Sequence, residues 1–199
     1  MRSFIEAALA TAVLLFIAPI LVLVTIAIVL DSPGNPFYGA RRIGLRGRGF
    51  RMWKFRTMVV NAAQTGPAIT YSGDRRITRV GRLLRRTKLD EIPQLFNVVL
   101  GDMSLVGPRP ETPSMVACYT AEQRAVLAVK PGVTGRVQIA SGEESDQIPA
   151  SVDPDLYYRE HLMDRKLAAD LEYLRERTLF SDIRVLFATA AYVLRSFAR

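Results

Sequence analysis

The sequence has very little of the two residue types that build most metal sites and all disulfide bonds. Cysteine occurs once, at Cys118, and histidine occurs once, at His161. One cysteine cannot form a disulfide within the chain, which is typical of a protein kept in a reducing compartment. One histidine argues against a zinc site built from several histidines and against a Ser-His-Asp triad. The chemistry of any site therefore has to come from other side chains.

Negative charge is also scarce relative to positive charge. The 199 residues include 27 Lys and Arg against 19 Asp and Glu, for a net charge of +8. This balance favours an anionic partner such as nucleic acid, an acidic membrane surface or a phosphorylated substrate. Hydrophobic residues make up 49% of the chain, which argues against overall disorder. The length suits one domain with its own core and a small appendage.

Charged residues are missing from the segment 7–30, and a run of this length is typical of a membrane segment. It is too long for the core of a cleaved signal peptide, and no small-x-small cleavage pattern follows it. Pro19 lies near its middle and lacks the N–H that a helix interior needs. A kinked spanning helix and a helix-turn-helix that re-enters the same face both fit. The second form needs positive charge at both ends, and arginines flank both: Arg2, Arg41, Arg42, Arg46, Arg48, Arg51.

The first half of the remaining chain predicts a strand and two helices. Apolar residues alternate with cations over 50–60, which favours a short strand. Apolar residues at helical spacing favour a helix over 74–87, with Asp74 as its candidate N-cap and arginines on its other face. A second helix is expected over 89–101, where Gly101 would end it.

The second half predicts mostly helices, so the fold class is α/β, predominantly helical with a small β element. Helices are expected over 112–129, 156–178 and 181–199. A short extended segment followed by an acidic loop is expected over 132–155. The last helix has an apolar face flanked by arginines, so it is either a core helix or one that lies among lipid headgroups.

An acidic pair, Asp90 and Glu91, directly follows the arginine-rich helix expected over 74–87. The helix dipole favours carboxylates at a helix start, so the pair has a plain structural explanation. A chemical explanation comes from Arg85 and its basic neighbours. Cations and a helix N-terminus lower the pKa of a carboxylate and gather phosphate groups beside it. One ionised carboxylate can then attack phosphorus while its neighbour holds Mg²⁺.

Arg109 lies between Pro108 and Pro110, which restrict its backbone. A guanidinium held in this way suits bidentate binding of phosphate, although an arginine in a surface loop would have the same sequence. Lys54 and Arg56, in the expected strand, likewise fit either a phosphate site or solvated strand charges.

These segments together resemble the bacterial sugar transferases, the small monotopic phosphoglycosyl transferases that act on polyprenyl phosphate. The resemblance covers nearly the whole chain in order: "DSPGNPFY…RRIG…F…WKFRTM", "LRRTKLDEIPQLFNVVLGDMSLVGPRP" and "PGVTGRVQ". It implies transfer of a phospho-sugar from a UDP-sugar to undecaprenyl phosphate, with polyprenyl diphosphate-sugar and UMP as products. This reaction is the first membrane step of glycoconjugate synthesis, for example of exopolysaccharide.

The resemblance also implies roles for individual residues. Asp90 matches the nucleophile, which forms a covalent phospho-sugar intermediate, and Glu91 matches the carboxylate that binds the cofactor Mg²⁺. The other matched positions are expected to bind substrate: Lys54, Arg56, Arg85, Pro108, Arg109, Pro110, Arg136, Gln138. Arg136 stands where many members have an aromatic residue, so the identity of the sugar does not carry over.

In this family the N-terminal segment is a re-entrant hairpin, which here would cover residues 1–30 and be broken at Ala18–Pro19. Ala18 replaces a serine that could bond a backbone carbonyl at the bend. Residues 31–199 would form the catalytic domain, on the cytoplasmic face of the bacterial inner membrane, with its C-terminal helices in the interface. The expected partners are a UDP-sugar, polyprenyl phosphate and the lipid bilayer, without nucleic acid, and a homodimer is left open.

Two other functions would use the positive charge differently. A membrane-tethered nucleic-acid binder would place the arginines of 74–87 on phosphates, and a scaffold would use them to recruit other membrane enzymes. Neither function needs Asp90 or Glu91, and acids beside the arginines would weaken binding to nucleic acid. Release of UMP from a UDP-sugar distinguishes the transferase from both.

Overall fold

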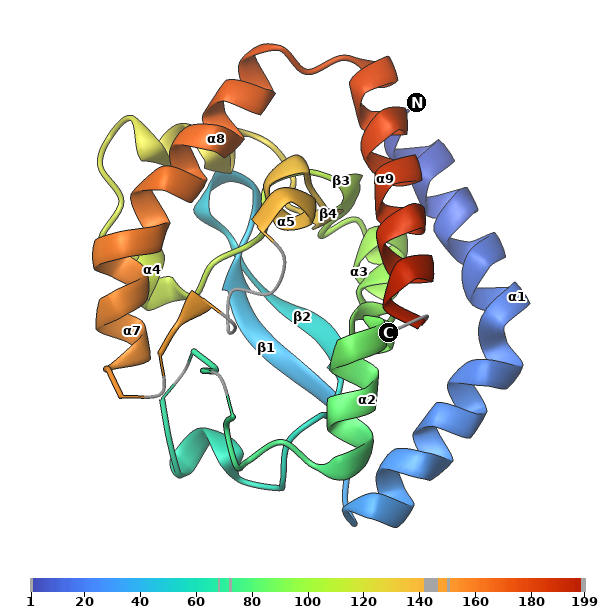
Figure 1. The fold of residues 1–199 in the computed structure, drawn as a ribbon. Helices are drawn as coiled ribbons and strands as arrows, with labels where there is room; N and C mark the ends of the chain where they lie inside the picture. Colours follow the sequence, from blue (N-terminus) through green and yellow to red (C-terminus); the bar gives the residue numbers. More distant parts are fainter. Residues whose placement is uncertain (1, 68, 72, 142–146, 150, 198–199) are drawn as a thin grey trace.

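The computed structural model describes residues 2–67, 69–71, 73–141, 147–149 and 151–197. A long N-terminal helix, α1 (Arg2–Asp31), lies along one side of a body formed by the later elements (Figure 1). That body is mostly helical and includes two small sheets. The predicted fold class, predominantly helical with a small β element, is therefore confirmed.

Helix α1 is continuous although Pro19 lies inside it, and Figure 1 shows that it bends near its middle. Proline removes a backbone hydrogen bond and its ring displaces the carbonyl one turn earlier, which accounts for a bend. In the described part of the chain, this is the one helix long and apolar enough to cross a membrane. Apolar side chains along it are exposed, including Phe16 and Leu30. The hairpin broken at Ala18–Pro19 stays a prediction.

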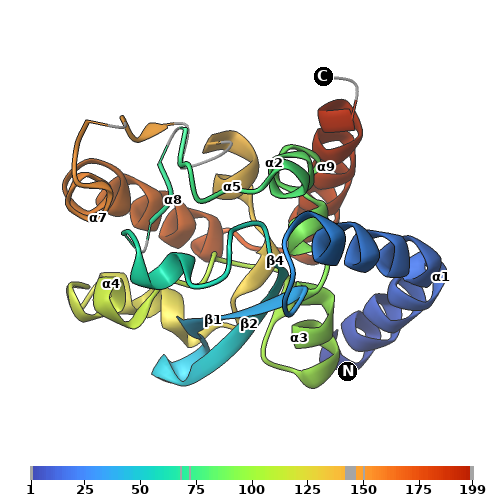
Figure 2. The same cartoon turned by 90° about the horizontal axis from the view of Figure 1, so that it is seen from below.

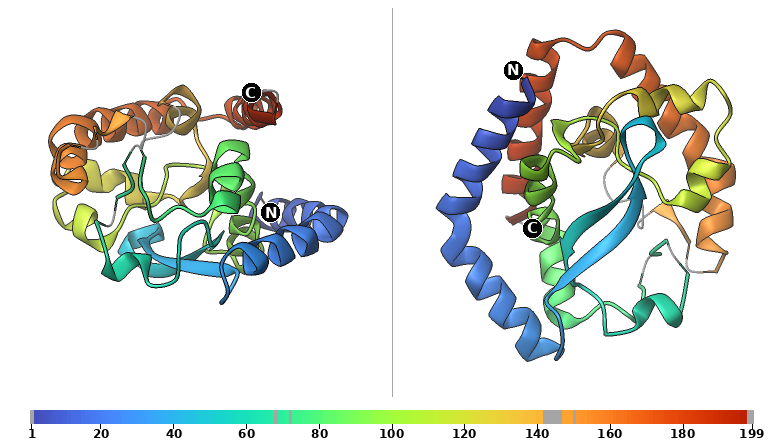
Figure 3. Two further views of the ribbon diagram at one scale, coloured as in Figure 1. Left: turned by 60° about the horizontal axis from the view of Figure 1, so that its bottom comes forward. Right: turned by 180° about the vertical axis from the view of Figure 1, so that it is seen from behind.

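Both ends of α1 are attached to the same body. Near the N-terminal end, the Glu6 carboxylate accepts a hydrogen bond of 2.8 Å from the Ser104 hydroxyl. At the other end, the Asp31 carboxylate accepts one of 2.9 Å from the backbone N–H of Val80. Between these points α1 packs beside α3 (Gln94–Leu100), as Figures 2 and 3 show. The helix is therefore anchored at both ends rather than attached at one.

The longer sheet is an antiparallel hairpin of β1 (Phe37–Ile43) and β2 (Gly49–Phe55). Met52 and Phe55 on β2 are buried in the core. The strand predicted over 50–60 is confirmed as far as Phe55. Lys54 therefore lies at the C-terminal end of β2, where the strand meets the acidic pair.

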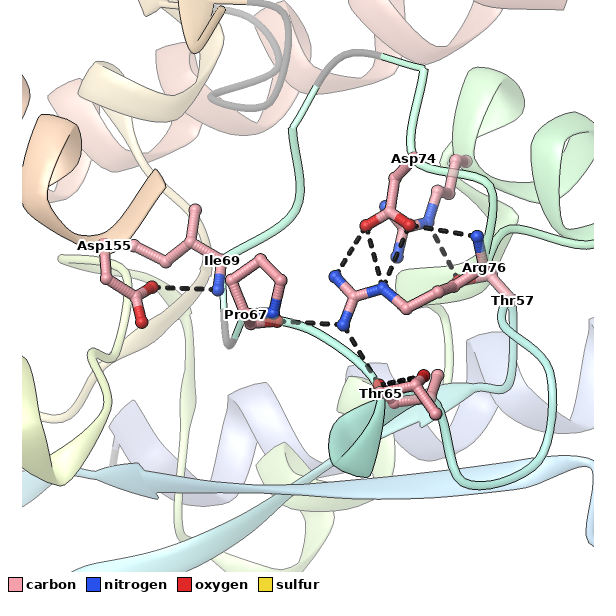
Figure 4. Close-up of polar contacts among 9 residues, drawn as sticks. Thr57, Thr65, Pro67, Ile69, Asp74, Arg76 and Asp155 are labelled. Carbon is pink, nitrogen blue, oxygen red and sulfur yellow. Dashed lines mark hydrogen bonds and ion pairs between the residues drawn. The ribbon is translucent and has the colours of Figure 1, made fainter. Parts of the chain in front are cut away.

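A buried ion pair holds the loop that precedes α2 (Arg79–Thr87). The Asp74 carboxylate accepts hydrogen bonds from the Arg76 guanidinium, which also donates to two loop carbonyls (Figure 4). The prediction that Asp74 caps the helix is wrong. Thr78 is the N-cap, and its hydroxyl accepts a hydrogen bond of 3.0 Å from the Gly81 N–H. Asp74 lies about one helical turn before the N-cap position, and its carboxylate is paired with Arg76.

The helix predicted over 89–101 is divided. After α2 the chain reverses at Lys88, whose φ is +61°, and forms a 3₁₀ turn (Leu89–Glu91). Helix α3 begins only after Pro93, because proline has no N–H to continue the hydrogen bonds of the turn before it. The predicted end at Gly101 is confirmed, with φ +86°.

A second, unpredicted sheet pairs β3 (Ser104–Val106) in parallel with β4 (Gly132–Thr134). The two segments touch at glycines, since a Cβ atom on Gly132 would lie 2.1 Å from the backbone nitrogen of Gly107. No side chain fits at such an approach. Strands of this length give no periodic signal in a sequence, although the extended start of 132–155 was predicted. The sheet places the Pro-Arg-Pro loop beside the β4 segment.

Two predicted segments contain more breaks or structure than expected. The helix over 112–129 is divided into α4 (Pro113–Ala117) and a 3₁₀ stretch, Gln123–Ala128. Thr120 and Gln123 exchange side-chain to backbone hydrogen bonds, and this reciprocal cap starts the second piece. The region 132–155 also contains a helix, α5 (Arg136–Ser141). Residues 142–146 and 150 of its acidic loop lie outside the described residues.

The two C-terminal helical predictions are confirmed, the second as far as Phe197, since residues 198–199 lie outside the described residues. The first consists of α7 (Pro154–Tyr157), a π-helical turn (Tyr158–Leu162) and α8 (Met163–Arg175), and the second is α9 (Leu179–Phe197). Helix α8 packs on α4 through a shared apolar core. Helix α9 contributes Val185 to a buried apolar cluster and exposes Phe187 and Leu194 by 73% and 71%. Its predicted place among lipid headgroups stays a proposal.

Candidate active site

Asp90 and Glu91 share a 3₁₀ turn but have different surroundings. The turn packs against β2 and the end of α2. Asp90 is buried, with 6% of its surface exposed. The Glu91 side chain is 19% exposed and lines a cavity. Two neighbouring carboxylates in unlike environments can take separate chemical roles.

Two cations bind Glu91. Lys54 Nζ lies 2.8 Å from Oε1, and the Arg109 guanidinium donates over 2.5 Å to Oε1 and over 3.2 Å to Oε2. Burial acts to raise the pKa of Glu91, but Arg109 and Lys54 outweigh it and hold that pKa well below its usual range. Glu91 is therefore an anion at neutral pH, with a fixed orientation.

The pKa of Asp90 is shifted the other way. Burial raises it, and the charge of Glu91 adds to the rise, while Lys54, Arg85 and Lys88 act against it. The predicted net lowering of the carboxylate pKa holds for Glu91 and is wrong for Asp90, where the cations are outweighed. Burial prevails because a carboxylate removed from water loses its hydration. Asp90 is thus the more basic of the two carboxylates.

Further cations flank the pair from the end of α2. Arg85 donates a hydrogen bond of 2.9 Å from Nε to the Thr57 hydroxyl, and its charge acts on Asp90. Lys88 lines the same cavity as Glu91, and its Nζ lies 5.8 Å from the centre of the Tyr192 ring on α9. With Lys54 and Arg109, these residues give the site more cations than carboxylates, which suits phosphate groups.

The backbone of its own loop positions Arg109. The carbonyl of Pro108 accepts a hydrogen bond of 2.9 Å from the Gly132 N–H, and the neighbouring Gly107 N–H donates one of 2.9 Å to the Thr134 carbonyl. Pro108 and Pro110 are both buried. The loop therefore presents Arg109 to Glu91 from a rigid segment.

A cavity of about 240 Å³ lies beside Glu91. Its charged lining residues are Lys88, Glu91, Arg109 and Lys166. Apolar side chains from the start of α3, β4, α5 and α9 form most of the remainder: Ile92, Leu95, Val133, Val137, Ile139, Tyr192, Val193. Gln138 also lines it, and its Oε1 is buried without a hydrogen-bond partner among the described residues. The lining suits a ligand that joins phosphate to apolar or hydroxyl-bearing groups.

The structure thus brings Lys54, Arg85 and Arg109 to the acidic pair, with Pro108 and Pro110 on either side of Arg109 and Gln138 in the lining of the same cavity. Four other predicted residues lie elsewhere: Arg56, Arg136, Ala18, Pro19. Arg56 donates to the backbone carbonyls of Ser32 and Pro33, where the chain leaves α1. Arg136 is exposed on α5 and lines a second cavity. Ala18 and Pro19 lie within α1.

The sequence reasoning missed a buried network of Glu111, Tyr158 and Lys166. Lys166 lies in a helix with charged residues on its exposed side, so nothing in the sequence distinguishes it from a solvated lysine. Glu111 directly follows the Pro-Arg-Pro motif, and that position is the one signal that could have drawn attention to it.

The carboxylates fit a magnesium ion that shares its coordination with substrate. In the described ranges, no group of three or more His, Cys, Asp or Glu side chains could hold a metal ion. Magnesium at phosphate-transfer sites takes one or two carboxylates, with phosphate and water as its other ligands. Glu91 keeps acceptor capacity beyond Lys54 and Arg109, because a carboxylate has about four lone-pair sites. The pair suits this shared arrangement rather than a site of protein ligands alone.

Comparison with known proteins gives consistent results. A sequence model of the family described as bacterial sugar transferase matches residues 1–196. A UDP-glucose:undecaprenyl-phosphate glucose-1-phosphate transferase of Caulobacter vibrioides is 37% identical over 96% of this chain and 67% of its own length. An enzyme with the same name from Escherichia coli is 36% identical, over 91% of this chain and 37% of its own length.

A UDP-N-acetylgalactosamine-undecaprenyl-phosphate N-acetylgalactosaminephosphotransferase of Aeromonas hydrophila is 34% identical, over 90% of this chain and 40% of its own length. The chain thus spans two fifths or less of two of these relatives and two thirds of the third. The relatives are named for different sugars, so similarity at this level does not identify one.

Proposed function

Because the chain belongs to the bacterial sugar transferase family, we propose that it transfers a sugar phosphate from a UDP-sugar to undecaprenyl phosphate through a covalent intermediate on Asp90. The observation that carries the proposal is the contrast within the acidic pair. Asp90 is buried with a raised pKa, whereas Lys54 and Arg109 hold Glu91 as an anion. Asp90 is suited to attack phosphorus, and Glu91 is suited to hold a cation beside the diphosphate.

The reaction takes place in two displacements. An Asp90 carboxylate oxygen bonds to the β-phosphorus of the UDP-sugar, and the bond from that phosphorus to the bridging oxygen breaks. The electron pair stays on the bridging oxygen, which leaves as part of UMP. A phosphate oxygen of undecaprenyl phosphate then attacks the same phosphorus and releases the Asp90 carboxylate. Arg85, Lys88 and Arg109 lie where their charges stabilise the negative oxygens of both steps.

Magnesium, when bound, would neutralise charge on the diphosphate, with Glu91 as its carboxylate ligand. Lys54 and Arg109 keep Glu91 ionised and oriented for that purpose. Asp90 is then left free to attack, because the organising carboxylate is a different residue.

Three features support a monotopic position on the cytoplasmic face of the inner membrane. Glu6 and Asp31 attach both ends of α1 to one body, which a helix crossing to the far side could not do. Helices α1 and α9, with their exposed apolar side chains, lie on the same side of that body (Figures 1 and 2). Exposed arginines on α2, such as Arg82 and Arg86, would contact acidic lipids, worth about 1 kcal/mol each near the surface.

UMP release from a panel of UDP-sugars, with Mg²⁺ and undecaprenyl phosphate, tests the proposal. We expect Asp90→Asn to abolish release and Glu91→Gln to reduce it strongly, with Arg175→Met as a matched exposed control. Mass spectrometry of a stopped reaction should find one phospho-sugar adduct, on the peptide that contains Asp90. Wild-type rates in Asp90→Asn, or an adduct on another residue, would refute the assignment and reopen the scaffold and nucleic-acid functions.

A further inference from the structure

A buried lysine lies between the cavity beside Glu91 and a second one. The Lys166 side chain on α8 is 9% exposed. It lines both the cavity beside Glu91 and the neighbouring cavity of about 500 Å³. Among the described residues, only Val137 on α5 shares this position.

The ammonium of Lys166 has fixed partners. Its Nζ lies 2.6 Å from Glu111 Oε1 and 2.8 Å from the Tyr158 hydroxyl, which itself donates to Glu111. Burial acts to raise the pKa of Glu111, but Lys166 and Tyr158 outweigh it and lower that pKa. Tyr158 begins a π-helical turn, a feature that recurs at functional sites. The network therefore keeps a charged lysine in one orientation.

The same rigid segment serves this network and the acidic pair. Arg109 binds Glu91, and Glu111, two positions later, binds Lys166. The carbonyl of Glu111 accepts a hydrogen bond of 2.9 Å from the Ile43 N–H at the end of β1, which holds the segment in place. One segment therefore holds both Arg109, which binds Glu91, and Glu111, which binds Lys166.

The second cavity suits an anionic small molecule. Its lining includes the cations Arg136, Arg165 and Lys166, and one carboxylate, Glu172. The remaining lining residues are apolar or neutral: Val137, Ala140, Gln147, Tyr158, Leu162, Ala169. Its volume falls in the usual range for small-molecule sites, about 300–1,000 Å³. The cavity beside Glu91 is smaller and mostly apolar, so the two differ in the ligand they favour.

The proposed reaction also builds negative charge on the leaving group, next to the phosphorus under attack. When the bond to the β-phosphorus breaks, negative charge grows on the α-phosphate of the departing UMP. A cation directed at the leaving phosphate would stabilise that charge. Lys166 is the one described cation that lines both the cavity beside the acidic pair and the larger cationic cavity.

We infer that Lys166 binds the α-phosphate of the UDP-sugar and that the second cavity holds the nucleoside monophosphate part of the donor. This inference rests on the proposed function. It makes Lys166 a substrate-binding residue, and Glu111 and Tyr158 the residues that position it.

The test compares three substitutions on α8 in the full chain. Lys166→Met should raise the KM for the UDP-sugar and the inhibition constant of UMP about 10- to 100-fold, the range of a lost charge-assisted hydrogen bond. The KM for undecaprenyl phosphate should stay within about twofold of wild type. Lys166→Arg should recover part of the UMP affinity. Arg175→Met, an exposed residue of α8 that lines neither cavity, should change none of these values.

Equal shifts for UMP and for undecaprenyl phosphate, or an unchanged UMP constant, would overturn the inference. If Lys166→Met does not fold, Arg165→Gln replaces it, because Arg165 is exposed and lines only the second cavity. That variant should weaken UMP inhibition severalfold without changing Tm, and an unchanged inhibition constant would again refute the inference. Failure of the wild-type protein to release UMP would instead refute the proposed function.

Discussion

Replacing Arg109 tests the charge arrangement of the site most directly. Arg109 donates two hydrogen bonds to Glu91, and Lys54 donates one. A lysine at position 109 keeps the charge but cannot donate in a fork. Methionine keeps the length and removes the charge, so Glu91 would be held by Lys54 alone.

The structure sets the size of the effect. The two side chains are 22% and 19% exposed, so solvent screens the pair only weakly. A hydrogen bond to a charged group contributes about 1.5–3 kcal/mol. Loss of one such bond in Arg109→Lys should lower kcat/KM about 10- to 150-fold. Arg109→Met removes a partner of a mostly buried carboxylate and should cost about 3 kcal/mol or more of stability.

The pH dependence gives an independent measure. The folded-state pKa of Glu91 lies below its unfolded value of about 4.3. The interaction with Arg109 therefore adds stability above that value, and this stability is lost as the pH falls through the folded pKa. In Arg109→Met, burial dominates and the pKa of Glu91 rises. The stability that wild type gains over Arg109→Met should therefore shrink as the pH falls toward about 4.

The assay is UMP release and thermal unfolding, each measured from pH 4 to pH 8. The Arg175–Glu122 pair is the control, since its side chains are 73% and 77% exposed and Arg175→Met should alter neither curve. If the Tm of Arg109→Met fell by the same amount at every pH, Arg109 would not determine the ionisation of Glu91.

Three other predictions follow from the packing. Gly81→Ala should unfold several degrees below wild type in calorimetry, because its Cβ would lie 2.0 Å from the Thr57 carbonyl oxygen, whereas Gly49→Ala, with its nearest atom at 4.0 Å, should not. Asp74→Asn should lower the free energy of urea unfolding by about 3 kcal/mol at neutral pH, since Asp74 is the buried partner of Arg76. The folded-state pKa of Asp74 is lowered, so this difference in free energy should shrink as the pH falls below about 4. A difference that stayed constant with pH would contradict the prediction. In a chain with Cys118→Ser, cysteines introduced at Ser3 and Asp102 should react with an impermeant reagent from the same side of sealed vesicles, and opposite sides would indicate a spanning α1.

Local signals in the sequence were sufficient for the outer parts of the fold. The apolar run, the amphipathic helices near the C-terminus and Gly101 at a helix end are all encoded by neighbouring residues. The short elements were harder to predict from the sequence. The strands of sheet β3·β4 are too short to give a periodic signal, and the cap between Thr120 and Gln123 divides a segment whose periodicity favours one longer helix.

The site itself shows the same division. Asp90, Glu91, Arg85 and Arg109 could be selected from the sequence because their residue types and their family resemblance agree. The ionisation of these residues could not be predicted from the sequence, because the burial of Asp90 depends on packing between segments far apart in the chain. Lys166 was not predicted as a site residue for the same reason, since it is buried only where α8 packs against other elements.

The sequence by itself determined which reactive groups are available and that the N-terminal helix is apolar, because both depend on residue identity and short-range spacing. Only the tertiary structure decided that Glu91 is the bound anion and Asp90 the more basic carboxylate. It also decided that a lysine 75 residues from Glu91 lines the same cavity (166 against 91 in the chain). Electrostatic interactions depend on distance in space and on access of water, and neither quantity can be read from position along a chain.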